Sequence, residues 1–285
     1  MVVAMDIASR VLLRVLVVLL SSLVASTALA APGLKAGSSN EFNVELPREL
    51  REMAGRGQVS PVKHALVAVS VPANFDGSRD WPVLVISSSR GRTPDDPQYH
   101  SSRRLSGAYA DTAVAAGWIV VAADPAEDVS GVEDDIPLRY ALNVAALAAL
   151  ELQWPRAGKA PLAFGGFSGG AKNSGWLAAA FARQGRSVIG IYAAGINEDT
   201  IVSAAQHFKV LTDAYKRIPI FLQSGEKDEI ATPADHRRVA DELRNAGFRN
   251  VRVESFPGPH AVEPELLRTA LDWFRELGAP AAAAK

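Results

Sequence analysis

Short apolar runs rich in Val and Ile alternate along most of the chain with longer stretches whose apolar positions recur at helical spacing. A short apolar run bounded by turn residues is typical of a buried strand, and a longer amphipathic stretch is typical of a helix. The pattern predicts strands at His64–Val71, Val83–Ser87, Trp118–Ala123, Ala160–Gly165, Ser187–Ala193, Ile218–Gln223 and Val251–Phe256. It predicts helices at roughly Ser102–Ala116, Ile136–Gln153, Gly170–Gln184, Thr200–Tyr215, Pro233–Ala246 and Glu263–Leu277.

This alternation of strands and helices predicts an α/β fold, with a mainly parallel, doubly wound sheet covered by helices on both faces. In such sheets ligands bind beyond the carboxyl ends of the strands. We therefore expect the chemically active side chains to follow directly after strands. No repeat at a fixed period is present, which argues against a solenoid or a propeller.

The first thirty residues have the pattern of an export signal. Arg10 and Arg14 supply positive charge, an uncharged, mainly apolar run covers Val15–Ala30, and Ala28 and Ala30 fit the small-residue rule for signal peptidase. The run is shorter than the roughly 20 apolar residues of a spanning helix. We expect cleavage after Ala30, a periplasmic or secreted protein, and no stable membrane insertion once the signal is removed.

The rest of the chain divides into three parts. Residues 31–61 are polar and contain Gly and Ser, so we expect an N-terminal extension there. Residues 62–278 carry the alternating pattern and are expected to form the α/β domain. Residues 279–285 are rich in Ala and are expected to be a flexible tail.

Composition narrows the possible chemistry. Among 285 residues, Lys and Arg total 30 and Asp and Glu total 31, so the formal net charge is -1 and indicates no nucleic-acid partner. The chain has no Cys, which excludes disulfides, thiolate zinc sites and a cysteine nucleophile. No His pair has the spacing of metal ligands, and neither a Gly-x-Gly-x-x-Gly motif nor a P-loop is present. We expect no metal and no cofactor.

One serine lies in a sequence context typical of a nucleophile. Gly166–Gly170 reads Gly-Phe-Ser-Gly-Gly and lies between a predicted strand and a predicted helix. A serine exposed on a sharp turn between these elements requires small flanking residues, because neighbouring backbone comes close. The turn also places Ser168 at a helix N-terminus, where the N–H of Gly169 can stabilise an oxyanion. A glycine-rich turn that only packs the helix tightly on the sheet is the alternative.

A serine nucleophile needs a base, and His260 is the best of the five histidines. It lies in the loop Pro257–His260, directly after the last predicted strand, where an imidazole can reach over the edge of the sheet. His207 and His236 lie inside predicted helices and His64 starts a strand, so each is expected to have a packing or surface role. His100 lies in a polar loop.

The imidazole in turn needs an acid to fix its tautomer. Asp228 is our first choice, since it lies in the short turn after the strand Ile218–Gln223 and can be aimed at the His260 loop. The alternatives are Glu226 and Glu229 in the same turn, and Glu198 and Asp199 after the preceding strand.

The order of Ser168, Asp228 and His260 in the chain resembles that of the α/β-hydrolase superfamily, and the likeness covers nearly all of residues 31–285. It is closest to the branch of esterases and dienelactone-hydrolase-like proteins, although a serine stands here in place of the cysteine of true dienelactone hydrolases. The resemblance implies a Ser-His-Asp triad made of these three residues.

The resemblance also implies an oxyanion hole of two backbone N–H groups. Gly169 supplies one, and the loop after Val83–Ser87 would supply the other. Family members often carry His-Gly in that loop, whereas this chain has serines, of which Ser89 is our first choice and Ser88 the next. Nearby side chains expected to line the substrate site are Ser88, Arg90, Tyr99 and His100.

These features predict an exported serine hydrolase that cleaves carboxylic esters through an acyl-enzyme intermediate, on small-molecule or polymeric substrates. The same triad can cleave amides, so a serine peptidase of the same fold is one alternative. A non-catalytic binding protein with this fold is the other, because fold alone does not determine function.

Overall fold

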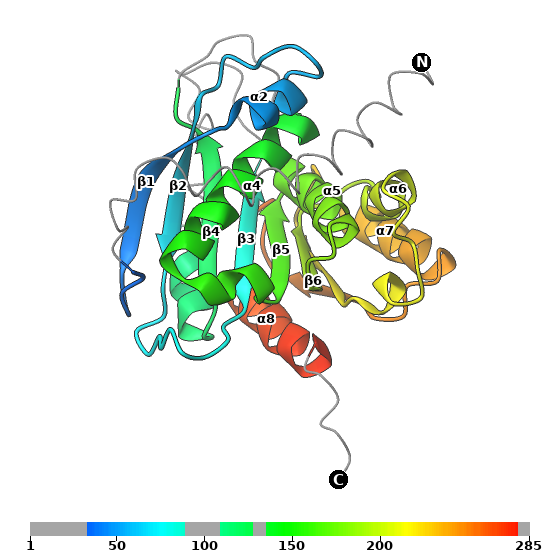
Figure 1. The fold of residues 1–285 in the computed structure, drawn as a ribbon. Helices are drawn as coiled ribbons and strands as arrows, with labels where there is room; N and C mark the ends of the chain where they lie inside the picture. Colours follow the sequence, from blue (N-terminus) through cyan, green and yellow to red (C-terminus); the bar gives the residue numbers. More distant parts are fainter. Residues whose placement is uncertain (1–32, 89–108, 128–134, 279–285) are drawn as a thin grey trace.

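The computed structural model describes residues 33–88, 109–127 and 135–278. Within these ranges the chain forms one sheet of eight strands (Figure 1). Their order is β1-β2-β4-β3-β5-β6-β7-β8, and the pairs β1–β2 and β2–β4 are antiparallel while the others are parallel. The strands are β1 (Ser39–Glu45), β2 (His64–Ser70), β3 (Val83–Ser88), β4 (Ile119–Pro125), β5 (Leu162–Phe167), β6 (Val188–Ala194), β7 (Ile220–Gly225) and β8 (Val251–Phe256).

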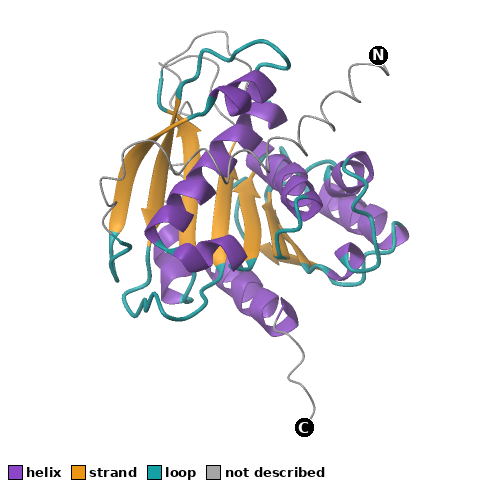
Figure 2. Cartoon of the chain, in the orientation of Figure 1, coloured by secondary structure: helices purple, strands orange, loops and turns teal. Residues whose placement is uncertain are grey.

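Helices cover both faces of this sheet (Figure 2). One face packs against α2, α4, α5, α6 and α7, and the other packs against α8 and a helical segment at 109–115. The α-helices are α2 (Arg48–Ala54), α4 (Ile136–Gln153), α5 (Gly169–Arg183), α6 (Ile201–His207), α7 (Pro233–Asn245) and α8 (Pro264–Gly278), and the 3₁₀ turns are η1 (Pro155–Lys159) and η2 (Tyr215–Arg217).

The two faces follow from alternation along each strand, because successive side chains of a strand point to opposite sides. In β7, Ile220 and Leu222 pack into the core under α7, while Phe221 packs into the core under α8. The next residue on the α8 face is Gln223, and its side chain is completely buried. A polar side chain in this position requires hydrogen-bond partners.

The seven predicted strands are confirmed, each with ends within two residues of the expected ones. The helix predicted for Thr200–Tyr215 is too long, because α6 ends at His207. Lys209 then adopts a positive φ of 56°, a conformation that no helix interior contains. The helix predicted for Ser102–Ala116 begins outside the described residues, and its part at 109–115 is helical.

The N-terminal extension predicted for residues 31–61 contributes to the sheet and to the core. Its β1 pairs with β2 over the whole strand, from Ser39 opposite Ser70 to Glu45 opposite His64. Leu46 and Leu50 are buried in the same core as α4. Residues 31 and 32 aside, this segment is therefore part of the α/β unit. The predicted signal segment 1–30 and the tail 279–285 lie outside the described residues. No helix in the described part of the chain is long and apolar enough to cross a membrane.

Candidate active site

Ser168 lies in a tight turn between β5 and α5. Its φ of 56° and ψ of -119° are strained for a residue with a side chain. The turn is possible because Gly166 has no Cβ: a Cβ there would lie 2.3 Å from the carbonyl of Gly170 and 2.6 Å from the Ser87 oxygen. The close approach that the sequence predicted is therefore present at Gly166.

The turn leaves both the Ser168 side chain and a backbone donor available. Ser168 lies at the N-cap position of α5, but its hydroxyl does not cap the helix. Its own N–H donates to the Ala194 carbonyl at the end of β6, over 2.8 Å. Gly169 is the first residue of α5, so its N–H has no acceptor within the helix. The N-terminal end of a helix also favours negative charge.

Asp228 lies in the turn between β7 and α7, with only 4% of its surface exposed. Its Oδ1 accepts hydrogen bonds from the N–H groups of Ile230 and Ala231, both over 2.8 Å, and its Oδ2 accepts from His260 Nδ1 over 2.7 Å. Burial alone would raise the pKa of Asp228. The three donors outweigh burial and lower the pKa below its usual value, so the carboxylate is charged at neutral pH.

Among the described residues, none of the other candidate acids is hydrogen-bonded to His260. Glu226 and Glu229 are exposed in the same turn. Glu198 pairs with Lys172 over 2.6 Å. Asp199 Oδ1 accepts from the first N–H groups of α6, over 2.9 and 3.1 Å, so this carboxylate holds the start of that helix. Asp228 is the acid that the structure brings to His260.

The loop that carries His260 is joined to the Asp228 turn through its backbone. Lys227 N–H donates to the Gly258 carbonyl and Glu226 N–H donates to the Phe256 carbonyl, each over 2.9 Å. A Cβ at Gly225 would lie 2.3 Å from the Pro259 oxygen, so the two segments can meet only at a glycine. Glycine at the end of β7 thus allows the histidine loop to approach the acid.

The His260 ring packs against the residues that surround Ser168. Its centroid lies 4.5 Å from that of Phe167, the residue before the serine. On another side the ring contacts Gly195, where a Cβ would lie 2.7 Å from His260 Cε1. An ionised carboxylate can only accept a hydrogen bond, so His260 Nδ1 carries the proton and donates this hydrogen bond to Asp228. In the neutral imidazole this leaves Nε2 unprotonated and able to accept a proton. Within the described residues, Ser168 and His260 are not hydrogen-bonded to each other, a bond that commonly tightens only when substrate binds.

The other histidines have separate partners or positions. His64 Nδ1 pairs with Glu127 over 2.6 Å. His207 is at the end of α6 and packs edge-on against Trp176. His236 is completely buried in α7, where its Nδ1 donates to the Thr232 carbonyl over 3.0 Å, and burial lowers the pKa of its imidazole. These positions agree with packing and surface roles. His100 lies outside the described residues.

The end of β3 adjoins the Ser168 turn. Ser88, the last residue of β3, lies opposite Phe167 in the register between β3 and β5. The carboxyl end of β3 therefore lies beside the turn that carries Ser168. Ser89, predicted for the oxyanion hole, and Arg90, Tyr99 and His100, predicted for the substrate site, all lie outside the described residues.

Two residues that hold this arrangement were not predicted from the sequence. Gly195 follows the end of β6 with a φ of 64° and leaves room for the His260 ring. Gln223 donates to the Ala261 carbonyl and accepts from the Glu263 N–H, on the far side of His260. The available signals are a glycine directly after a strand and a glutamine inside an apolar strand.

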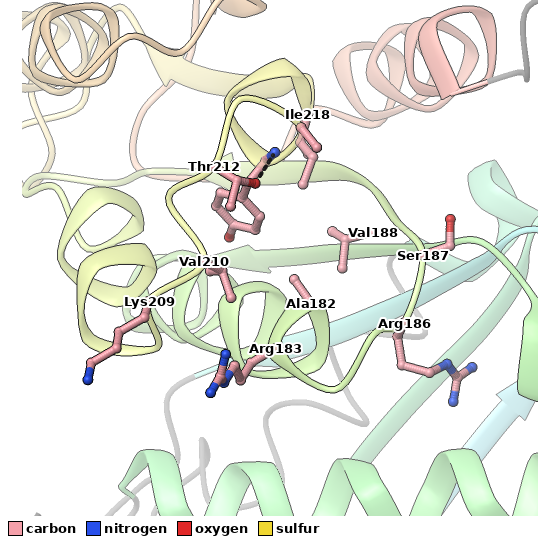
Figure 3. Close-up of a pocket in the computed structure, with 11 residues that line it drawn as sticks. Ala182, Arg183, Arg186, Ser187, Val188, Lys209, Val210, Thr212 and Ile218 are labelled. Atoms are coloured by element: carbon pink, nitrogen blue, oxygen red, sulfur yellow. Dashed lines mark hydrogen bonds between the residues drawn. The ribbon is translucent and has the colours of Figure 1, made fainter. Parts of the chain in front are cut away.

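A separate cleft of about 380 Å³ lies at the opposite end of β6 (Figure 3). It is formed by the end of α5, the start of β6 and the segment between α6 and β7, and its lining includes Val188 and Val210. By contrast, the Ser168 N–H donates a hydrogen bond to the carbonyl of Ala194, at the carboxyl end of β6. The cleft is therefore distant from the candidate nucleophile.

No family model matches the chain. No curated protein matches it in sequence either. Among solved structures, the chain is similar to an α/β serine hydrolase without a lid from Xanthomonas campestris, at 17% identity and a TM-score of 0.56, with 88% of this chain and 99% of that one covered. It is similar to an esterase from Pyrococcus furiosus at 14% identity and a TM-score of 0.53, covering 86% and 98% of the two chains. A dipeptidyl peptidase 4 from Porphyromonas gingivalis matches at 13% identity and a TM-score of 0.50, over 85% of this chain and 36% of that one.

At these identities the likeness establishes the fold. The sheet order, the helices on both faces and the matched structures together show that the chain has the α/β-hydrolase fold. The fold class predicted from the sequence is thus confirmed, and the predicted resemblance to α/β hydrolases holds at the level of the fold, in which the matched structures include a serine hydrolase and an esterase.

Proposed function

We propose that the protein is a serine hydrolase that cleaves carboxylic esters, with Ser168, His260 and Asp228 as its triad. The observation that carries this proposal is the imidazole of His260, which is held by a buried carboxylate and packed against the residue that precedes Ser168. A nucleophilic serine requires a nearby base that is itself oriented by a third group. A glycine-rich turn with only a packing role requires no such base.

In the proposed reaction, Ser168 Oγ attacks the ester carbonyl carbon while His260 Nε2 takes the hydroxyl proton. Asp228 accepts the Nδ1–H throughout, so it fixes the tautomer and stabilises the imidazolium. Collapse of the tetrahedral intermediate breaks the bond to the alcohol, which leaves with the proton from Nε2. Water then attacks the acyl-enzyme by the same steps, with His260 taking the proton of water and returning it to Ser168.

The negative oxygen of both tetrahedral intermediates needs backbone donors. The N–H of Gly169 meets this need because it is not used within α5 and lies at the positive end of the helix. The second donor is proposed to come from the segment after β3, with Ser89 as the first choice and Ser88 as the next. Each such donor contributes roughly 10²–10³ in turnover in related chemistry.

The preference for esters rests on the fold neighbours, which include an esterase. Both a small-molecule ester and a polymeric ester are compatible with the triad. A panel of p-nitrophenyl esters of increasing acyl length, run beside a panel of peptide p-nitroanilides, tests this preference directly. Turnover of esters that is abolished in Ser168→Ala supports the proposal. Turnover of peptides alone would assign a peptidase, and no turnover of either would favour a binding protein.

The location of the protein is a further part of the proposal. Arg10, Arg14 and the apolar run before Ala30 support export with cleavage after Ala30. Mass spectrometry of the protein isolated from its native host should show Ala31 as the first residue. An intact N-terminus on protein recovered from the cytoplasm would contradict export and would leave the proposed reaction unaffected.

A further inference from the structure

The buried side chain of Gln223 joins three parts of the chain. Its Nε2 donates to the Ala261 carbonyl over 2.8 Å, and its Oε1 accepts from the Glu263 N–H over 3.0 Å. The same Oε1 accepts from the hydroxyl of Tyr192, which is buried on β6. The carbonyl at Ala261 and the N–H at Glu263 fix which end of the amide is oxygen and which is nitrogen. An uncharged amide satisfies all three partners, whereas an ionised carboxylate has no donor for the Ala261 carbonyl.

These contacts fall at the segment that positions His260. The loop runs from the end of β8 at Phe256 to the start of α8 at Pro264. Before His260, the Gly258 carbonyl accepts a hydrogen bond from the Lys227 N–H. Directly after His260, the backbone at residues 261 and 263 is hydrogen-bonded to the Gln223 side chain. The imidazole is therefore held at its ring by Asp228 and through the following backbone by Gln223.

The backbone of Gln223 also makes a hydrogen bond next to the His260 ring. Its carbonyl accepts from the Gly195 N–H over 3.1 Å. Gly195 is the residue against which the His260 ring packs, with no space for a Cβ. Gln223 is thus hydrogen-bonded through its backbone to Gly195, which contacts the imidazole, and through its side chain to the backbone that follows His260.

We propose that Gln223 is a positioning residue that sets the His260 imidazole relative to Ser168. The inference rests on the proposed hydrolase function, because it assigns His260 as the base. Gln223 touches the histidine loop and not the reacting atoms. Its loss is expected to lower kcat and leave KM nearly unchanged, since a base displaced by about 1 Å costs on the order of 10²-fold in rate.

Two substitutions separate positioning from packing. Gln223→Leu keeps a similar volume and removes all three hydrogen bonds. Gln223→Glu keeps the acceptor for Tyr192 and Glu263, but when ionised it presents a carboxylate to the Ala261 carbonyl. Protonation of that carboxyl restores a donor, so the activity of Gln223→Glu relative to the unsubstituted protein should rise as the pH is lowered. A role in packing alone predicts a constant ratio.

Asn143→Ala is a matched control. Asn143 is also a buried amide, and its Nδ2 donates to the Arg139 carbonyl within α4, on the opposite face of the sheet from Gln223. The control should lose thermal stability and retain the kcat and pH profile of the unsubstituted protein.

The test combines p-nitrophenyl ester kinetics with proton NMR of the hydrogen bond between His260 and Asp228. We expect kcat to fall about 10- to 100-fold in Gln223→Leu, and the downfield Nδ1–H resonance to shift or broaden. The inference is overturned if folded Gln223→Leu keeps the original kcat and resonance. It is also overturned if Gln223→Glu shows a constant activity ratio across pH.

These outcomes are distinct from failure of the proposed function. If the unsubstituted protein hydrolyses no ester, the hydrolase proposal fails, while the NMR resonance still reports whether Gln223 positions His260. If Gln223→Leu does not fold, Tyr192→Phe removes one hydrogen bond from the amide and should reduce kcat by a smaller factor. An unchanged kcat and resonance in both Tyr192→Phe and Gln223→Glu would refute the inference.

Discussion

A methyl group added at Gly195 tests the position of the His260 ring. In the structure, a Cβ at this residue would lie 2.7 Å from His260 Cε1, 3.1 Å from Nδ1 and 3.2 Å from Phe167 Cε2. Ordinary contact begins at 3.4 Å, so Gly195→Ala reaches ordinary contact only if the imidazole and the backbone at residue 195 separate by about 0.7 Å. A shift of this size away from Asp228 would weaken the hydrogen bond that now spans 2.7 Å.

Two costs are expected for Gly195→Ala, and they differ in magnitude and in kind. The positive φ of 64° disfavours a side chain by about 1–2 kcal/mol. For a protein of this size, 1 kcal/mol corresponds to a fall in Tm of about 2–4 °C. Displacement of the base is expected to lower kcat by on the order of 10²-fold, since reacting groups tolerate little misplacement.

Gly185→Ala supplies the matched control, because Gly185 has a φ of 81° and no atom lies within 4 Å of its added Cβ. It should show a similar backbone cost and no loss of kcat. Thermal unfolding and p-nitrophenyl ester hydrolysis of the two variants, measured side by side, give both quantities. If Gly195→Ala keeps the kcat of Gly185→Ala, the reasoning about the His260 ring is refuted.

Three further substitutions test other parts of the site. Asp228→Asn should lower kcat by roughly 10⁴-fold, because the His260 tautomer is lost. Because the pKa of Asp228 is lowered in the folded protein, its carboxylate stabilises the fold above the unfolded pKa of about 3.9, and this stabilisation declines as the pH falls below that value. The stability difference between the original protein and Asp228→Asn should therefore shrink as the pH is lowered below about 3.9, and a difference that stays constant there would contradict the lowered pKa. His236 has a pKa lowered by burial, so unfolding takes up a proton below about pH 6.5 and stability should fall there as the pH is lowered. Denaturant titrations should show a flatter pH dependence for His236→Gln, and an identical slope would count against a buried neutral imidazole. Gly166→Ala should prevent formation of the Ser168 turn and greatly reduce soluble protein, and a soluble, fully active variant would rule out the close approach at Gly166.

The central sheet was predictable because its strands are buried on both faces. Continuous apolar runs such as Val83–Ile86 are completely buried, and a run this short between turns is typical of a strand covered on both faces. The edge strand β1 was not predicted, since Ser39–Glu45 contains only Phe42 and Val44 as apolar residues and most of the strand is exposed. The pairing of β1 depends on contacts with β2, and these are distant in the sequence.

The places of Ser168 and His260 in the fold were predictable from the strand pattern and from the glycines that flank the serine. Ser168 and His260 each follow a clear strand, and parallel strands bring their carboxyl ends to one edge. The choice of Asp228 over neighbouring acids was less determined, because turn geometry decides which carboxylate points inward. Gln223 was not identified, since its partners on β6 and after β8 are brought together only by the folded sheet.

The central claim is that Ser168 is the nucleophile, and covalent labelling tests it most directly. Trypsin cleaves after Lys159 and Lys172, and the peptide between these sites contains Ser168 as its only serine, with no Thr or Tyr. After reaction with a fluorophosphonate, this peptide should carry one phosphonyl group, and the label should be absent from Ser168→Ala and strongly reduced in His260→Ala. A folded, unsubstituted protein whose peptide 160–172 stays unlabelled, or a label that persists in Ser168→Ala, would contradict the account.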